Sequence, residues 1–190
     1  MVQNPRRVDH ERPEPPVICT IGHSTKSISA FVELLSVGKA DFVIDVRSIA
    51  RSRTNPQYNH DTLPIELAAY QIGHVQIPEL GGLRKKSKTI PAEINSFWIN
   101  QSFHNYADYA LSDEFRAGLH RLIELASSRR CAIMCAEAVW WRCHRRIVAD
   151  YLLQNGRKVL HLMGSSRAEP ATMNEAARVA ANGLVYPGVP

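Results

Sequence analysis

The stretch CAIMCAEAVWWRCHRRIVADYLL, residues 131–153, decides the fold. It begins with an apolar run at 131–135, which predicts a buried β-strand, and it ends with a helical pattern at 147–153. Between the two lie a glutamate, two tryptophans, a cysteine, a histidine and three arginines. A strand that is apolar throughout and leads into a helix is typical of a parallel sheet covered on both faces.

The same unit recurs along the chain. Further apolar runs lie at 17–21, 42–46, 74–77 and 158–163, and helical patterns lie at 27–38, 62–73 and 111–127. We therefore expect a single α/β domain with three layers, α/β/α, around a mainly parallel five-stranded sheet. The expected organisation is a flexible, proline-rich leader at 1–16, the α/β domain at 17–164 and a C-terminal tail with a helical turn at 165–190.

The composition limits the classes of protein that fit. The chain has 190 residues, of which 45% are apolar and 22% charged, and no apolar run approaches the roughly 18–20 residues that span a bilayer. Its N-terminus lacks the apolar segment of a secretory signal, and four scattered cysteines do not form a disulfide framework. We therefore expect a cytoplasmic protein without a membrane partner, whose net charge of +5 favours an anionic small molecule or nucleic acid. The oligomeric state stays open.

Polar clusters follow four of the predicted strands. They begin at Gly22, Asp45, Glu79 and Ala136. Because the carboxyl ends of parallel strands meet at one edge of a sheet, where ligands bind in α/β proteins, we expect these clusters to converge there.

These clusters also carry a family resemblance. The motifs are Thr20-Ile21-Gly22-His23-Ser24, Asp45-Val46-Arg47-Ser48 with Ser52-Arg53, Leu80-Gly81-Gly82, and Cys135-Ala136-Glu137 with Cys143-His144-Arg145. Over about residues 17–163 the chain resembles the bacterial and archaeal DUF488 domain family. Trp140 and Trp141 stand where the resemblance leads us to expect a proline-containing segment. The resemblance implies a shared domain and no settled activity.

Cys135 has two interpretations. It ends a strand and precedes a helix, a place where backbone N–H groups and the helix dipole can lower the pKa of a nucleophilic thiol. The phosphatase pattern, however, needs an arginine where Trp141 stands, and Glu137 brings a negative charge close to the thiol. The alternative is a buried, inert cysteine.

Two carboxylates are also open to two interpretations. Glu137, on a loop with two tryptophans, could be withdrawn from water and act as a general acid or base, or it could pair with Arg47 or Arg145 and hold the loop. Asp45 could orient His23 or accept hydrogen bonds from the backbone of its loop.

A metal site could be drawn from Cys135, Cys143, His144 and His23. Their spacing matches no structural zinc pattern, and adjacent residues on a helix point roughly 100° apart. We therefore expect no metal and no cofactor, with Cys143 packed in the interior and His144 facing the crevice.

Arginines favour an anion at this edge. They cluster on two strand-end loops, and guanidinium groups bind phosphate in a bidentate manner. The leading hypothesis is a hydrolase- or transferase-like enzyme that binds a phosphate-bearing substrate, a nucleotide or a nucleic acid. The predicted catalytic residues are Glu137, His23, Cys135 and Asp45, and the predicted substrate-binding residues are Ser24, Arg47, Arg53, Gly81, Gly82, Trp141, His144 and Arg145.

Two alternatives belong to other classes. One is a non-catalytic nucleic-acid-binding module, in which the arginines contact phosphates and the tryptophans stack on bases. The other is thiol or sulfur chemistry at Cys135.

Overall fold

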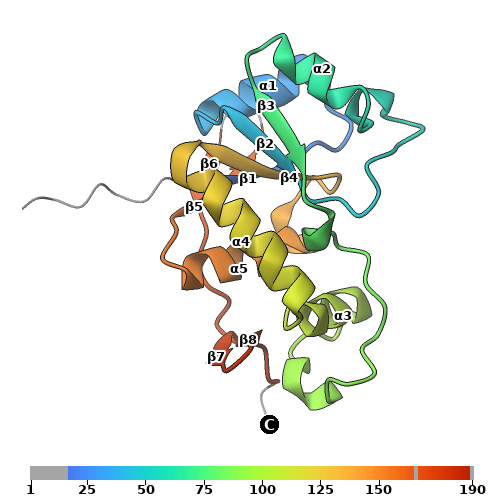
Figure 1. Ribbon diagram of the computed structural model, residues 1–190, viewed down its shortest axis with the longest axis vertical. Helices are drawn as coiled ribbons and strands as arrows, with labels where there is room; N and C mark the ends of the chain where they lie inside the picture. Colours follow the sequence, from blue (N-terminus) through green and yellow to red (C-terminus); the bar gives the residue numbers. More distant parts are fainter. Residues whose placement is uncertain (1–16, 165–166, 189–190) are drawn as a thin grey trace, which may run out of the picture.

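The computed structural model describes residues 17–164 and 167–188, which are drawn in colour in Figure 1. The predicted leader at 1–16 lies outside these residues. Within the described part of the chain, none of the helices combines the length and the apolar character needed to cross a bilayer.

Strands and helices alternate along most of the chain. The strands are β1 (Ile18–Gly22), β2 (Phe42–Asp45), β3 (Gly73–Gln76), β4 (Cys131–Cys135), β5 (Val159–Met163), β6 (Arg167–Pro170), β7 (Arg178–Ala180) and β8 (Gly183–Val185). The α-helices are α1 (Ile28–Val37), α2 (Leu63–Ala68), α3 (Gln101–Tyr109), α4 (Asp113–Ser128) and α5 (Arg145–Gln154). Short 3₁₀ turns are η1 (Pro56–Tyr58), η2 (Pro78–Leu80), η3 (Ala92–Asn95) and η4 (Trp140–Arg142).

The main sheet has the strand order β3-β2-β4-β1-β5-β6. The first five of these strands pair in parallel, which confirms the predicted α/β class and the mainly parallel sheet. The sixth strand, β6, pairs antiparallel with β5, so the prediction of five strands is one short. The sequence of β6, RAEP, has no apolar alternation that could have revealed it.

The segment predicted as a C-terminal tail includes residues 167–188, which the structure describes and which pack against the domain. Besides β6 it forms the small hairpin of β7 and β8, in place of the expected helical turn. Leu184 and Tyr186 are buried, and the Tyr186 hydroxyl donates to a carboxylate oxygen of Asp150 at 3.0 Å. Among the described residues of this stretch, which is rich in alanine, Leu184 and Tyr186 are the only large apolar side chains that are buried, too few for a periodic pattern to show.

Two hydrophobic cores lie on opposite faces of the sheet. Phe31 of α1 and Leu63 of α2 pack with Val43 and Met134 on one face. On the other face, helices α3, α4 and α5 pack on alternate residues of the same strands, such as Ile133. This alternation follows from strand geometry, in which successive side chains point to opposite faces.

The position of the helices creates a crevice beside β4. The connections after β1 and β2 lead to helices α1 and α2 on one face, whereas the connection after β4 leads to α5 on the other. Because β4 lies between β1 and β2 in the sheet, neighbouring connections diverge at its carboxyl end. Ligands of open α/β sheets bind at such a point.

Candidate functional site

The loops that follow β1, β2 and β4 meet at this carboxyl edge. The backbone N–H of His23 donates to the carbonyl of Cys135 at 2.9 Å, and that of Ser24 donates to Ala136 at 3.0 Å. His23, Arg47 and Glu137 line one cleft, so the structure brings together three residues that lie far apart in the sequence.

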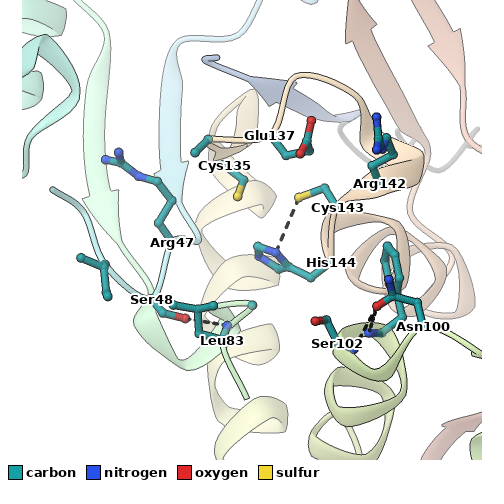
Figure 2. Close-up of a pocket in the computed structure, with 14 residues that line it drawn as sticks. Arg47, Ser48, Leu83, Asn100, Ser102, Cys135, Glu137, Arg142, Cys143 and His144 are labelled. Atoms are coloured by element: carbon teal, nitrogen blue, oxygen red, sulfur yellow. Dashed lines mark hydrogen bonds between the residues drawn. The ribbon is translucent and has the colours of Figure 1, made fainter. Parts of the chain in front are cut away.

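Two adjoining clefts open there. The thiol cleft, of about 390 Å³, is lined by Cys135, Cys143, His144 and residues of the β2 loop and α3, and it is the view in Figure 2. The histidine cleft is lined by His23, Ser24 and the loop after β2. Arg47, Ile49, Ala136 and Glu137 line both clefts, so these residues form the boundary between them.

A buried ion pair supports the histidine cleft. Asp45 is fully buried and Arg47 is 5% exposed. The Arg47 side chain donates from Nε to Asp45 Oδ1 at 2.9 Å, and from Nη2 to Asp45 Oδ2 and to the Tyr58 carbonyl, both at 2.6 Å. Nη1 lies 3.3 Å from His23 Nε2. Four of the five guanidinium N–H groups are therefore committed within the protein, and this pair stabilises the loop after β2.

His23 is held neutral by its surroundings. Its Nδ1 lies 2.8 Å from the Ser24 carbonyl, which can only accept, so Nδ1 carries the proton and Nε2 accepts from Arg47. The ring stacks on Tyr58, with centroids 4.0 Å apart. Burial, reinforced by the charge of Arg47, lowers the pKa of His23 to about 4. Ser24 beside it has a φ of 48°, a left-handed backbone that turns the chain away from the edge.

Three potential ligand atoms converge in the thiol cleft. The Sγ atoms of Cys135 and Cys143 and the ring nitrogen of His144 all lie within 4.8 Å of one another, and Figure 2 shows these side chains pointing toward a common centre. We refer to these three residues as the thiol cluster. Cys143 Sγ lies 3.5 Å from His144 Nδ1, and His144 Nε2 lies 3.0 Å from the Val46 carbonyl. Because that carbonyl accepts, Nε2 carries the proton and Nδ1 presents its lone pair to the sulfur.

The two thiols have opposite acidities. The hydrogen bond with Cys143, together with burial, raises the pKa of Cys135 well above its ordinary value. Burial also opposes ionisation of Cys143, but the hydrogen bond from Cys135 and the charge of Arg145 outweigh it and lower the pKa of Cys143. Of the two interpretations of Cys135, this arrangement favours the inert cysteine, because the cationic group donates to Cys143.

Cys143 and His144 point the same way because neither lies in the body of α5. The helix begins at Arg145, and Cys143 has an extended backbone, with φ −125° and ψ 147°. The expected angle of roughly 100° between adjacent helical side chains therefore does not apply. Cys143 is buried, as expected, but it packs against His144 and Arg145 at the wall of the cleft.

Arg145 is buried behind this cluster. It is 1% exposed, its Nε donates to Cys143 Sγ at 3.3 Å, and its Nη2 donates to the Glu137 carbonyl at 2.6 Å. In the part of the chain that the structure describes, no carboxylate pairs with its guanidinium group. Its positive charge therefore faces sulfur and not an external anion.

Close backbone approach accounts for the predicted glycines. A Cβ on Gly82 would lie 2.4 Å from His144 Nδ1, and one on Gly22 would lie 2.0 Å from the Glu137 carbonyl oxygen. Gly81 lies in the same way against Ser48. The glycines thus allow tight packing around the thiol cluster and the Glu137 loop.

Glu137 lies on the boundary between the clefts. Its side chain is exposed, and among the described residues its carboxylate has neither a hydrogen bond nor an ion pair, so the structure does not contain the pairing with Arg47 or Arg145 that was one of its two interpretations. The tryptophans do not cover it. Trp140 stacks on His161 at 4.2 Å, and Trp141 packs edge-on against Trp140 with 43% of its surface exposed. This carboxylate is therefore accessible to solvent and to a bound molecule.

Four of the predicted substrate-binding residues do not line either cleft, namely Arg53, Gly81, Trp141 and Arg145. Arg53 is exposed on the loop after β2, and Trp141 lies outside the lining. Arg84, from the basic loop after β3, packs over the Tyr109 ring at 3.7 Å and donates to carbonyls of its own loop. These side chains follow the same strands in sequence, but loop geometry directs them elsewhere.

Helix α3 forms a wall of the thiol cleft that was not predicted from the sequence. Asn100, Ser102 and Phe103 line the thiol cleft, and Asn100 caps the helix by accepting from the Ser102 backbone N–H at 2.9 Å. A signal was present: Asn100 precedes apolar residues at 103, 106, 107 and 110, which is helical spacing.

Comparison with known proteins identifies a family that covers much of the chain. The family described as "Domain of unknown function DUF488" matches residues 27–152, which is more than half of the chain. Neither the curated proteins nor the solved structures include a significant match.

Proposed function

The chain belongs to the DUF488 family, and from the charges around its clefts we propose that it is an enzyme acting on an anionic, phosphate-bearing substrate at the carboxyl edge of the sheet. A nucleotide is the substrate class that best fits a cleft of about 390 Å³. The reaction would be a hydrolysis or a group transfer assisted by a general acid or base.

One observation carries this proposal. Among the described residues that line the two clefts, three are arginines, Arg47, Arg51 and Arg142, and one is a carboxylate, Glu137. A concave site lined by positive charge attracts anions, and guanidinium groups bind phosphate oxygens well. Arg142 is exposed and has no ion pair in the described part of the chain, so its whole guanidinium group is available.

The buried pair restricts the roles of the other predicted residues. Arg47 offers at most one uncommitted N–H, so it adds mainly positive potential. Both ring nitrogens of His23 are engaged, and burial keeps it neutral, which favours a positioning role. We assign proton transfer to Glu137, the exposed carboxylate between the clefts.

The test is mass spectrometry of small molecules retained by the purified protein. Glu137→Gln keeps the size of the side chain and removes its basicity, so this variant should accumulate an anionic compound that the wild type turns over. Arg142→Ala should reduce retention at least about tenfold, since it removes a charge-assisted hydrogen bond. Arg121→Ala, on the exposed surface of α4, is the matched control and should retain the compound normally.

Other outcomes would redirect the proposal. Equal retention in Arg142→Ala and Arg121→Ala would contradict an anion site at this edge. A nucleic-acid-binding module would instead bind single-stranded DNA with an affinity that falls steeply with salt and does not depend on Glu137.

A further inference from the structure

We propose that Cys135, Cys143 and His144 bind a zinc ion, with the fourth coordination position open to the thiol cleft. The three ligand atoms lie within 4.8 Å of one another and line the same cleft. Two sulfurs and an imidazole nitrogen are donors that select zinc over magnesium or calcium, which prefer oxygen. The spacing of these residues in the sequence predicts no metal, and this proposal departs from that prediction.

The spacing of Cys143 and His144 fits a tetrahedral ion. Zinc bonds of about 2.3 Å to sulfur and about 2.0 Å to nitrogen place a sulfur and a nitrogen ligand about 3.5 Å apart. Cys143 Sγ and His144 Nδ1 are separated by 3.5 Å. These two ligands therefore need little movement to share an ion.

His144 is already oriented as a ligand. Its Nε2–H donates to the Val46 carbonyl at 3.0 Å, which leaves the Nδ1 lone pair facing Cys143. A histidine bound to a metal nearly always donates its other ring N–H to a carbonyl or a carboxylate, because this hydrogen bond fixes the tautomer. Gly82 leaves the space that the Nδ1 side of the ring needs, since a Cβ there would lie 2.4 Å from Nδ1.

The buried charge of Arg145 is a second, independent observation. Its guanidinium group is 1% exposed, has no carboxylate partner among the described residues, and donates to Cys143 Sγ at 3.3 Å. This hydrogen bond fixes the Cys143 sulfur at the wall of the cleft and would hold it in place as a ligand.

The open position connects the metal to the proposed function. Catalytic zinc sites keep three protein ligands and leave one position for water or substrate, whereas structural sites are closed by four. Glu137 is the carboxylate that lines the cleft beside the cluster, so it could take a proton from a zinc-bound water. This catalytic role rests on the proposed function, but the binding of zinc does not.

The first experiment measures the metal content of the full chain. Protein produced with zinc in the medium should contain about one zinc ion per chain by elemental mass spectrometry. After chelation and reloading with cobalt(II), the protein should show sulfur-to-cobalt charge-transfer absorption and the intense visible bands of a tetrahedral site. Less than about a tenth of an equivalent of zinc, with no charge-transfer band, would overturn the proposal.

Variants assign the ligands. Cys143→Ser and His144→Ala should each lower zinc affinity at least about 100-fold, because second-shell changes alone cost roughly 10–100-fold. Cys131→Ser is the matched control, since Cys131 is a buried cysteine at the other end of β4, and it should bind zinc like the wild type. Equal affinity in all three variants would overturn the assignment.

A second measurement uses unaltered protein, so it does not depend on the variants folding. In the chelated protein, iodoacetamide should label Cys143, which lines the cleft, ahead of Cys19 and Cys131, whose pKa values burial raises to about 11 and about 12. Zinc should protect Cys143 from labelling. Labelling unaffected by zinc, or a disulfide between Cys135 and Cys143 in freshly isolated protein, would contradict the metal site.

The two proposals fail separately. Zinc bound at the cluster, with no compound accumulating in Glu137→Gln, would remove the proposed function and leave the metal site. If the protein never binds zinc but retains an anion in a way that depends on Arg142, the metal site is removed and the proposed function stands.

Discussion

Two groups of buried polar side chains lie on opposite faces of the sheet, at the same carboxyl edge, and they differ in the kind of partner that their charged side chains meet. On the α1 and α2 face, Asp45 neutralises Arg47, and His23 uses both ring nitrogens. On the α5 face, Arg145 has no carboxylate partner among the described residues, and two sulfurs and a nitrogen face one another. The comparison contrasts a charge paired with a carboxylate, which stabilises the fold, with a charge placed beside sulfur, where we propose that a metal binds.

The largest expected effect is on the face where the charge is paired with a carboxylate. Asp45→Asn would leave Arg47 buried without its counter-charge, and we expect the free energy of unfolding to fall by about 3–5 kcal/mol. Urea denaturation followed by circular dichroism measures this change. A loss below about 1 kcal/mol would mean that Arg47 finds water or another partner, and the contrast between the two faces would disappear.

The next effect is a pH dependence. The pKa of His23 is about 4 in the folded protein and 6.5 when unperturbed, so the unfolded chain takes up a proton first as the pH falls. The stability that neutral His23 contributes is present above pH 6.5. As the pH falls toward 4, the free energy of unfolding decreases by roughly 3 kcal/mol. His161, with a pKa lowered to about 4 by burial, acts in the same direction. Asp150, with a pKa raised to about 6 by burial, acts in the opposite direction.

A substitution isolates the share of His23. His23→Gln should reduce the slope of unfolding free energy against pH, between 4 and 6.5, by about 1.4 kcal/mol per pH unit. Urea denaturation at several pH values gives both slopes. Identical slopes would show that His23 titrates normally and is not part of a closed network.

A smaller effect on stability is expected in the thiol cleft. Gly82→Ala would push the His144 ring away from the cluster and break its hydrogen bond to Val46, at a cost of about 1 kcal/mol. Zinc affinity should nevertheless fall at least about tenfold, because the ligand nitrogen moves. Thermal denaturation and zinc titration of the same sample separate the two quantities. Unchanged zinc affinity would show that His144 is not a ligand.

The smallest effect is expected at the exposed rim. Arg51 and Asp61 approach to 3.8 Å, but both side chains are more than half exposed. Arg51→Ala should therefore change the free energy of unfolding by less than about 0.5 kcal/mol. A larger change by urea denaturation would mean that the rim, and not only the buried pair, stabilises the loop after β2.

The location of the site could be predicted from the sequence, because apolar strands followed by helices require a parallel sheet and bring polar strand ends to one edge. The roles of individual residues could not. Arg47 carries the same charge whether it binds an anion or Asp45, and only the fold decides which partner it meets. Cys143 and His144 point the same way because α5 begins only at Arg145. If the helix began two residues earlier, both residues would lie within it and their side chains would diverge.

The short strand β6 has a consequence for how this protein behaves in a crowded solution. It covers the outer edge of β5, and it is itself a poor template for another chain, since it is four residues long, ends at Pro170 and carries the ion pair of Arg167 and Glu169. The row of backbone groups on β5 that would otherwise recruit a neighbouring strand is thereby blocked. The terminal segment thus protects the sheet from edge-to-edge aggregation at this margin.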